Sequence, residues 1–363
     1  STGMVLIIVT RNIDLSVGSI LGFVGMIMGV LQAEVLAQWL GFGHPLIWML
    51  ALIAGIAIGM TIGAFHGFVI AYLAVPAFIV TLGGLLVWRG AAWWVTSGRT
   101  VAPMDETFRL MGGGSQGAIG ATASWAVGVV ACLAIIAVIL AGRRQRKRFR
   151  FPLRPVWAEA FLAAVGCILV MGAVAVANAY MLPRRVAERY AEANNIPIPK
   201  DGVLQIAHGL PIPVLIALSV GVVMTFIATR TAFGRYVFAI GGNPEAAELA
   251  GINTKRVTMM IFMLMGALCA IGGAISTARL NAATNAQGTL DELLVIAAAV
   301  IGGTSLAGGV GTIVGAMLGA VVMQSLQSGM VLMGVDTPLQ NIVVGAVLVF
   351  AVWLDTLYRR RTG

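Results

Sequence analysis

The stretch from Ile47 to Tyr72 reads IWMLALIAGIAIGMTIGAFHGFVIAY and contains no Asp, Glu, Lys or Arg. About 20 apolar residues in a helix are enough to cross the hydrocarbon core of a bilayer, so this stretch predicts a membrane-spanning helix. Its glycines recur every four residues, at Gly55, Gly59, Gly63 and Gly67. This spacing places them on one helix face, where a second backbone can approach closely.

The whole chain has the composition of this stretch. Of its 363 residues 59% are hydrophobic and 10% are charged, and the mean hydropathy is +0.96, which excludes an ordinary soluble protein. Because the apolar runs are continuous rather than alternating, a β-barrel is disfavoured. We predict an all-α polytopic membrane protein, a single permease-like domain over residues 1–363 with about ten transmembrane helices. The expected spans are 15–37, 47–72, 76–97, 122–141, 156–177, 211–230, 257–278, 291–305, 311–333 and 340–358.

The first residues and the cysteines carry two smaller expectations. Met4–Thr10 is apolar and is similar to the end of a longer span, so we expect the natural protein to begin upstream with a further N-terminal helix. No signal peptide is recognisable. Cys132, Cys167 and Cys269 all lie in apolar runs, which predicts small buried side chains rather than disulfides.

The net charge of +9 is concentrated at three places. One loop, 142–155, carries seven basic residues: Arg143, Arg144, Arg146, Lys147, Arg148, Arg150 and Arg154. Without a soluble domain or aromatic stacking partners, this cluster indicates membrane topology, not nucleic-acid binding. Alternating spans then place it in the cytoplasm together with loop 231–256 and the tail Arg359–Arg361.

The opposite side receives loops 38–46, 98–121, 178–210 and 279–290. The longest of these, 178–210, is polar and nearly balanced in charge, with Arg184, Glu188, Lys200 and Asp201 among its residues. It is a candidate surface for an external partner. A solvated connector explains its composition equally well.

A second glycine row suggests an internal repeat. Gly311, Gly315 and Gly319 also stand four apart, and a proline follows each row at the start of a later span, Pro76 and Pro338. Transporters are often built from two related halves with the pathway between them. Glycine-rich membrane helices also arise by chance, so two repeated halves remain one of two interpretations.

The segment Gly241–Ile252 reads as a complete short helix outside the spans. Asn243 suits the N-cap, Pro244 the first helical position and Gly251 the stop, while Glu245 favours the positive end of the helix dipole. Two turns of helix are marginal alone in water, so something must pack against them. A cytoplasmic docking helix in loop 231–256 is therefore favoured over a turn that only joins two spans.

Two polar motifs are candidates for a solute pathway. Asp14, Ser16 and Ser19 stand at the start of a span, where a capping arrangement is the alternative. Thr304 and Ser305 belong to Ile301–Gly311, IGGTSLAGGVG, in which no lysine follows the glycines as a phosphate loop requires. A tight cytoplasmic turn is the expected structure of that motif.

No enzyme signature is present. His44, His66 and His208 are isolated, and neither HExxH nor GxSxG occurs, so no catalytic residue, metal site or cofactor is predicted for this chain. Ionisable residues within spans are few: Arg89, and Asp291 and Glu292 near an end. Proton-coupled machines keep such groups as relays, so their scarcity suggests an external energy source. Sodium bound by backbone carbonyls remains an alternative.

Four motifs, in order, resemble the membrane permease subunits of bacterial sugar ABC importers, to which ribose, xylose, arabinose and galactose permeases belong. They are Ile13–Ser19 (IDLSVGS), Val75–Gly83 (VPAFIVTLG), the loop Arg230–Arg256 and Val300–Gly311 (VIGGTSLAGGVG). Residues 122–177, with the basic loop inside them, resemble an extra helix pair of the xylose-type permeases, which makes xylose the first expectation for the substrate.

The resemblance implies a multi-pass protein of the bacterial inner membrane that pairs with a second permease copy. It further implies a separate cytoplasmic ATPase that carries ATP and Mg²⁺, and a periplasmic binding protein that delivers the sugar. The residues that would receive the ATPase stroke are Gly242, Asn243, Pro244, Glu245, Ala246, Ala247 and Gly251. The rival interpretations are an ion-coupled secondary transporter and an ABC permease for branched-chain amino acids or nucleosides.

Overall fold

The computed structural model describes residues 1–193, 204 and 206–362. Lys200 and Asp201 of the polar connector 178–210 therefore lie outside the described residues. The described part is helical, and its only β-structure consists of isolated bridges such as Val101 with Ala283. The predicted all-α class is confirmed.

Among the described residues, eight helical segments are long and apolar enough to span a bilayer, and Thr337–Trp353 is a shorter apolar helix. The prediction of about ten transmembrane helices agrees approximately with these eight segments and the shorter helix. The first segment, Val17–Leu40, consists of α2 (Val17–Val30), the π-helical turn η1 (Leu31–Leu36) and α3 (Ala37–Leu40). The others are α4 (Ile47–Tyr72), α5 (Ala77–Thr96), α7 (Gly120–Arg148), α8 (Val156–Ala179), α10 (Ile212–Arg230), α13 (Thr254–Leu280) and α15 (Ile313–Leu332).

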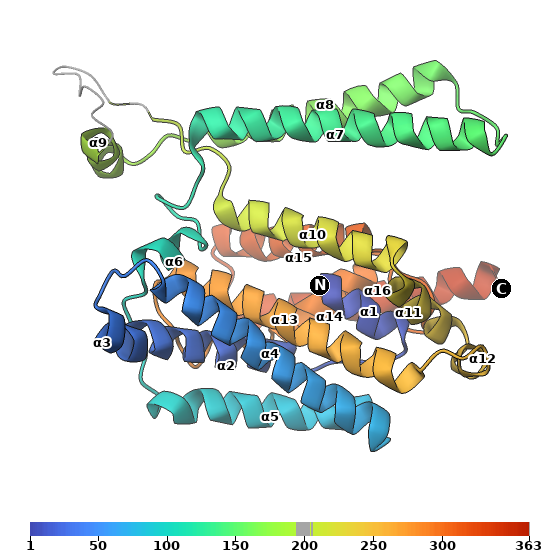
Figure 1. Cartoon of the computed structure of the whole chain (residues 1–363), viewed down its shortest axis with the longest axis horizontal. Coiled ribbons are helices and arrows are strands. Elements are labelled where there is room, and N and C mark those ends of the chain that lie inside the picture. Colours follow the sequence, from blue (N-terminus) through green and yellow to red (C-terminus); the bar gives the residue numbers. More distant parts are fainter. Residues whose placement is uncertain (194–203, 205, 363) are drawn as a thin grey trace. The chain divides into compact units, whose positions relative to one another are not determined.

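Seven further helices complete the described structure. They are α1 (Thr2–Val9), α6 (Glu106–Leu110), α9 (Arg184–Ala193), α11 (Ala232–Gly242), α12 (Pro244–Leu249), α14 (Asp291–Ile301) and α16 (Thr337–Thr362). The chain divides into two compact units (Figure 1). The bundle unit comprises Ser1–Gly112 with Ala217–Gly363, and the hairpin unit comprises Gly113–Ile216.

The centre of the bundle unit is the contact between α4 and α13, which the glycine row of α4 makes possible. A Cβ on Gly59 would collide with the carbonyl oxygen of Gly266, and one on Gly266 with the carbonyl of Gly59. A Cβ on Gly63 would likewise strike the carbonyl of Phe262, while Gly55 faces the Met28 side chain of α2. The two backbones therefore touch, as the spacing of the glycines predicts.

The second glycine row packs in the same manner against α14. A Cβ on Gly315 would meet the carbonyl of Gly302, and one on Gly319 the carbonyl of Ala298. Gly311, before α15 begins, lies against the side chains of Thr304, Val5 and Val9. Both glycine rows thus serve close helix contact, which does not by itself decide whether the halves are repeats.

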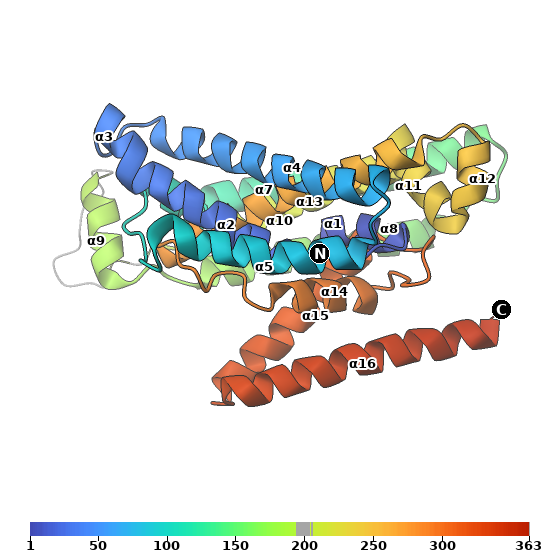
Figure 2. The ribbon, with the colours of Figure 1, turned by 90° about the horizontal axis from the view of Figure 1, so that it is seen from below.

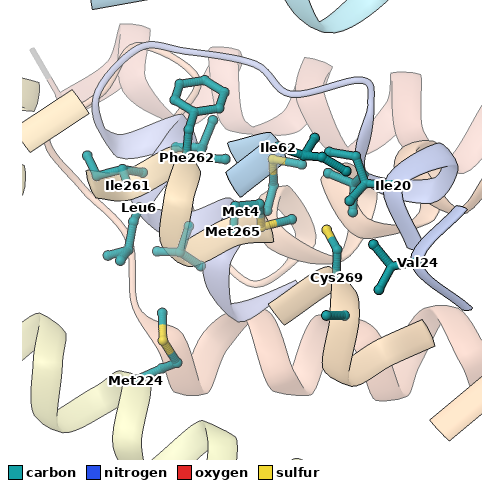
Figure 3. Close-up of a cluster of buried hydrophobic side chains, with 14 of the residues drawn as sticks. Met4, Leu6, Ile20, Val24, Ile62, Met224, Ile261, Phe262, Met265 and Cys269 are labelled. Carbon is teal, nitrogen blue, oxygen red and sulfur yellow. The ribbon is translucent and has the colours of Figure 1, made fainter. Parts of the chain in front are cut away.

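The short helix α1 is the most deeply buried element of the bundle unit. Met4–Val9 are each at most 1% exposed. Figure 3 shows Met4 and Leu6 of α1 among Ile261, Phe262 and Met265 of α13, with Ile20, Val24 and Ile62 from α2 and α4 completing the cluster. A helix of eight residues is too short to form alone, so its stability comes from this burial.

The span expected around α14 differs from the structure. The span expected at 291–305 is an 11-residue helix that ends at Ile301, because Gly303 follows with φ +87°. Its rise of about 16 Å is half of a hydrocarbon core. The preceding segment, expected as an external loop at 279–290, has a partly buried middle: Ala283 is 0% and Gln287 5% exposed, whereas Leu280 and Leu290 near its two ends are 55% and 42% exposed. The external placement of 279–290 stays a prediction.

The charge pattern agrees with the arrangement of the bundle unit. In both views α12 and the C-terminal end of α16 lie at the same end of this unit (Figures 1 and 2). The charge rule had placed loop 231–256 and the basic tail on one side of the membrane.

Candidate functional site

The predicted capped helix is present as α12. The Ala246 amide donates to Asn243 Oδ1 at 3.1 Å, and Pro244 occupies the first helical position. Gly251 takes φ +84° after the helix, a conformation that favours glycine. The capping chemistry read from the sequence is confirmed, whereas the role of these residues in coupling stays a prediction.

Helix α12 packs against the core of the same protein chain. Ala247 is only 4% exposed and belongs to the main core cluster, whereas Gly242, Asn243, Pro244, Glu245 and Ala246 are exposed. The argument that so short a helix needs a packing partner was right, but that partner need not be a second protein. The outer face is free for other contacts, and Leu249 is 91% exposed.

The base of α12, meaning Gly241 and Gly242 at the end of α11, is joined to the end of α1 by Arg11. Its Nε donates to the carbonyl of Gly241 at 3.1 Å and its Nη2 to the carbonyl of Gly242 at 2.8 Å. The Gly309 amide donates to the carbonyl of Val9 at 2.9 Å, and a Cβ on Gly241 would collide with that same carbonyl. The end of α1, the glycine-rich turn and the base of α12 thus form one junction.

Sequence reasoning missed Arg11. It stands 230 positions before its partner Gly241, and an arginine beside an apolar run is read by default as a topology signal. In the structure Arg11 has an unusual backbone φ of +63°, but its sequence neighbourhood does not predict this conformation.

The Asp14 motif forms part of a buried hydrogen-bonded chain. The Ser16 amide and hydroxyl both donate to Asp14 Oδ1, at 2.8 and 2.6 Å. Trp88 Nε1 donates to His66 Nε2 at 3.0 Å, and His66 Nδ1 lies 3.4 Å from Ser16 Oγ. Because the indole can only donate, Nε2 accepts and the proton of a neutral ring sits on Nδ1, directed at Ser16. The chain therefore runs from Trp88 through His66 and Ser16 to Asp14.

Arg89 of α5 holds the partly buried segment 285–288 before α14. Its Nη1 donates to the carbonyls of Asn285 and Gln287 at 3.0 and 2.7 Å, and its Nη2 to that of Gly288 at 3.0 Å. Irregular backbone within a membrane bundle needs such internal partners, since lipid offers none. The sequence singled out Arg89 as an intramembrane charge without finding this use.

The five candidate pathway residues, Asp14, Ser16, Ser19, Thr304 and Ser305, are each at most 1% exposed. Ser19 Oγ, Thr304 Oγ1 and Glu292 Oε2 are buried and have no hydrogen-bond partner among the described residues. Ser305 Oγ accepts from the Ala307 amide at 3.1 Å inside the predicted tight turn. No hydrogen bond in the described structure joins Thr304 or Ser305 to Asp14, Ser16 or Ser19, so a shared pathway remains a prediction. Within the described residues no group of three His, Cys, Asp or Glu side chains could hold a metal ion.

Comparison with known proteins identifies the chain. Residues 1–352 match the family described as branched-chain amino acid transport system / permease component. The chain belongs to this permease family. It is 37% identical over 362 residues to the xylose transport system permease protein XylH of Escherichia coli, covering all of this chain and 82% of the relative. No solved structure matches it.

Two further relatives extend the comparison. The XylH protein of Haemophilus influenzae is 36% identical, with 99% of this chain and 85% of the relative covered. The ribose import permease protein RbsC of Escherichia coli is 31% identical, with 98% and 80% covered. A permease of this family is a multi-pass transport subunit of the inner membrane, in agreement with the predicted family and localisation.

Proposed function

We propose that this permease carries a monosaccharide into the cytoplasm as the membrane subunit of an ATP-driven importer, with xylose as its substrate. The observation that carries the proposal is the similarity to xylose permeases along nearly the entire chain. The identity of 37% and 36% to the two xylose permeases, against 31% to the ribose permease, supports xylose over ribose.

A separate ATPase is the proposed energy source. It would bind ATP and Mg²⁺ on its own subunit and act on Gly242, Asn243, Pro244, Glu245, Ala246, Ala247 and Gly251 in and around α12. Exposed Leu249 and Glu245 offer the contact surface, whereas buried Ala247 transmits force to the core. Through Arg11 and Gly309 a push on α12 reaches α1 and the glycine-rich turn.

The remaining partners are a second permease copy and a periplasmic binding protein. In a homodimer each permease copy would contribute its own set of pathway candidates, Asp14, Ser16, Ser19, Thr304 and Ser305. The connector 178–210 and loop 98–121 are the proposed contacts of the binding protein.

The test is uptake by the full-length natural protein in liposomes with its ATPase and binding protein. We expect ATP-dependent uptake of xylose in preference to ribose and leucine. Preferred uptake of leucine would favour the amino-acid interpretation. Uptake driven by a sodium gradient without any ATPase would contradict the ATP-driven mechanism and support the secondary transporter.

A further inference from the structure

The basic stretch expected as loop 142–155 is the end of helix α7, through Arg148, together with the turn that joins α7 to α8. Most of its positive charges have no ion-pair partner in the described structure. Seven basic residues stand between positions 143 and 154. Arg143 pairs with Glu159 at 2.6 Å, and in the described structure no carboxylate pairs with the other six, which are all exposed. They are Arg144, Arg146, Lys147, Arg148, Arg150 and Arg154.

The turn is nevertheless folded, so these cations are held close together. The Phe151 amide donates to the carbonyl of Arg146 at 3.0 Å and closes the end of α7. Arg143 Nη1 also donates to the carbonyl of Arg154 at 3.3 Å, which ties the start of α8 to α7. Cations in the last turn of α7 favour the helix dipole, but Arg150 and Arg154 lie beyond that helix and gain nothing from it.

An apolar groove of about 280 Å³ lies between α7 and α8 next to this turn. Its walls are aliphatic, and Arg143 and Glu159 are its only charged lining residues. The lining residues are Ile136, Ile139, Leu140, Arg143, Val156, Glu159, Ala160 and Ala163. The groove therefore combines an aliphatic floor with a positively charged end.

Helical periodicity selects which cations stand over the groove. On α7 the lining positions are 136, 139, 140 and 143, and residues three and four further along share that face. Those residues are Arg146 and Lys147. Arg144 follows the lining residue Leu140 by four positions and lies at the other edge of the same face, whereas Arg148 lies farther around α7 and Arg150 lies beyond the helix.

Exposed aromatic residues surround the basic turn. Phe149, Phe151 and Trp157 are 60%, 62% and 73% exposed. Aromatic side chains next to Lys and Arg are typical of the layer where headgroups meet acyl chains. The turn thus has the chemistry of a lipid contact rather than of a surface facing bulk water.

We propose that the groove between α7 and α8 binds an anionic phospholipid. One acyl chain lies along Ile136, Leu140 and Ala163, and the phosphate is held by Arg146 and Lys147. Guanidinium and ammonium groups are the usual protein ligands for phosphate, and a basic cluster at the end of a span attracts anionic lipid. The Arg143–Glu159 pair separates the two parts of the site.

Native mass spectrometry of the full-length protein, incubated with equal amounts of phosphatidylglycerol and phosphatidylcholine with the same acyl chains, tests this proposal. We expect selective retention of phosphatidylglycerol. The variant R146Q/K147Q should bind it about thirty-fold more weakly, since each basic residue at an anionic surface contributes about fivefold. The matched control R148Q/R150Q removes equal charge from positions that do not share the lining face, and it should weaken retention clearly less than R146Q/K147Q.

A third variant tests the groove itself. Ala163→Phe fills it without changing any charge and should also reduce retention. Equal retention of both lipids, equal losses in the two charge variants, or a second protein copy in the groove in place of lipid would each overturn the proposal. The size-exclusion profile of each variant reports that it is folded, which is expected because the altered charges are exposed.

Discussion

Helices α4 and α13 of the bundle unit and helices α7 and α8 of the hairpin unit are all apolar enough to span a membrane, but they are packed very differently. In the most apolar window of α13, 44% of the residues are buried within the protein, against 6% in α7 and in α8. The hairpin helices are nevertheless the more apolar. Hydropathy therefore reports compatibility with lipid and not contact with other helices.

The two pairs differ in what their glycines meet. Gly59 and Gly63 of α4 lie directly against the backbone of α13, whereas a Cβ on Gly142 or Gly172 would find no atom within 4 Å. Lipid is as apolar as a leucine side chain, so association in a membrane depends on such close backbone contact and on polar contacts. In the bundle unit the glycines allow backbone to touch backbone, whereas in the hairpin Gly128 and Gly166 meet only side chains of the facing helix. An open groove lies beside the Arg143–Glu159 pair.

The largest expected effect comes from closing the contact between α4 and α13. Gly59→Leu places a side chain where Gly266 already lies, and we expect a loss of more than about 3 kcal/mol in the free energy of unfolding. Gly172→Leu on α8 is the control and should leave stability nearly unchanged. Thermal unfolding in detergent measures both. Equal destabilisation would show that the comparison between the two pairs is wrong.

Removing Arg89 should have the next largest effect. Arg89→Met leaves the carbonyls of Asn285, Gln287 and Gly288 without their donors, at a cost of about 2–3 kcal/mol. Arg99→Met, which breaks the exposed ion pair with Glu34, should cost under about 1 kcal/mol. Denaturant unfolding of the two variants gives the difference. A stable Arg89→Met protein would mean that the partly buried segment needs no support from α5.

Arg11→Gln weakens the junction without changing the exposed face of α12. We expect ATP hydrolysis to continue while sugar uptake per ATP falls about fivefold, the effect of roughly one hydrogen bond. Arg11→Lys should recover part of the uptake. Proteoliposomes with the ATPase measure both rates. If uptake and hydrolysis fall together in proportion, Arg11 does not act in coupling.

The smallest effect concerns a polar anchor of the hairpin unit. Ser124 Oγ donates to the carbonyl of Gly120 at 2.6 Å and accepts from the Leu210 amide at 2.8 Å. Ser124→Ala leaves that amide unpaired and should cost about 1 kcal/mol. Faster hydrogen exchange near Leu210, with unchanged exchange in α4, is the expected result. Faster exchange throughout α4 would show that this contact supports more than the hairpin unit.

The sequence predicted the elements whose signal is local. Apolar length identified the spans, glycine spacing identified the packed face of α4, and Asn243, Pro244 and Gly251 identified α12. It failed where the decisive contact is distant. The partly buried segment before α14 is held by Arg89, about 200 positions away, and the base of α12 is held by Arg11, 230 positions away. Neither contact could be predicted from neighbouring residues.

The candidate site was predictable to a similar extent. Asp14 and Ser16 were singled out as a capping group or a pathway, but their partners His66 and Trp88 come from two other helices. In the sequence His66 stands alone, because a contact between a histidine and other helices leaves no spacing pattern.

The central claim is that the exposed face of α12 receives the ATPase. A photocrosslinking residue placed at Leu249 in the full-length protein tests it, with Leu332 as the matched control. Both leucines are almost fully exposed, at 91% and 87%, but Leu332 ends α15, about 30 Å along that helix from its start beside the junction. We predict a crosslink to the ATPase from position 249 and none from position 332. Crosslinking from 332 alone, or from neither position in an actively transporting vesicle, would contradict the account.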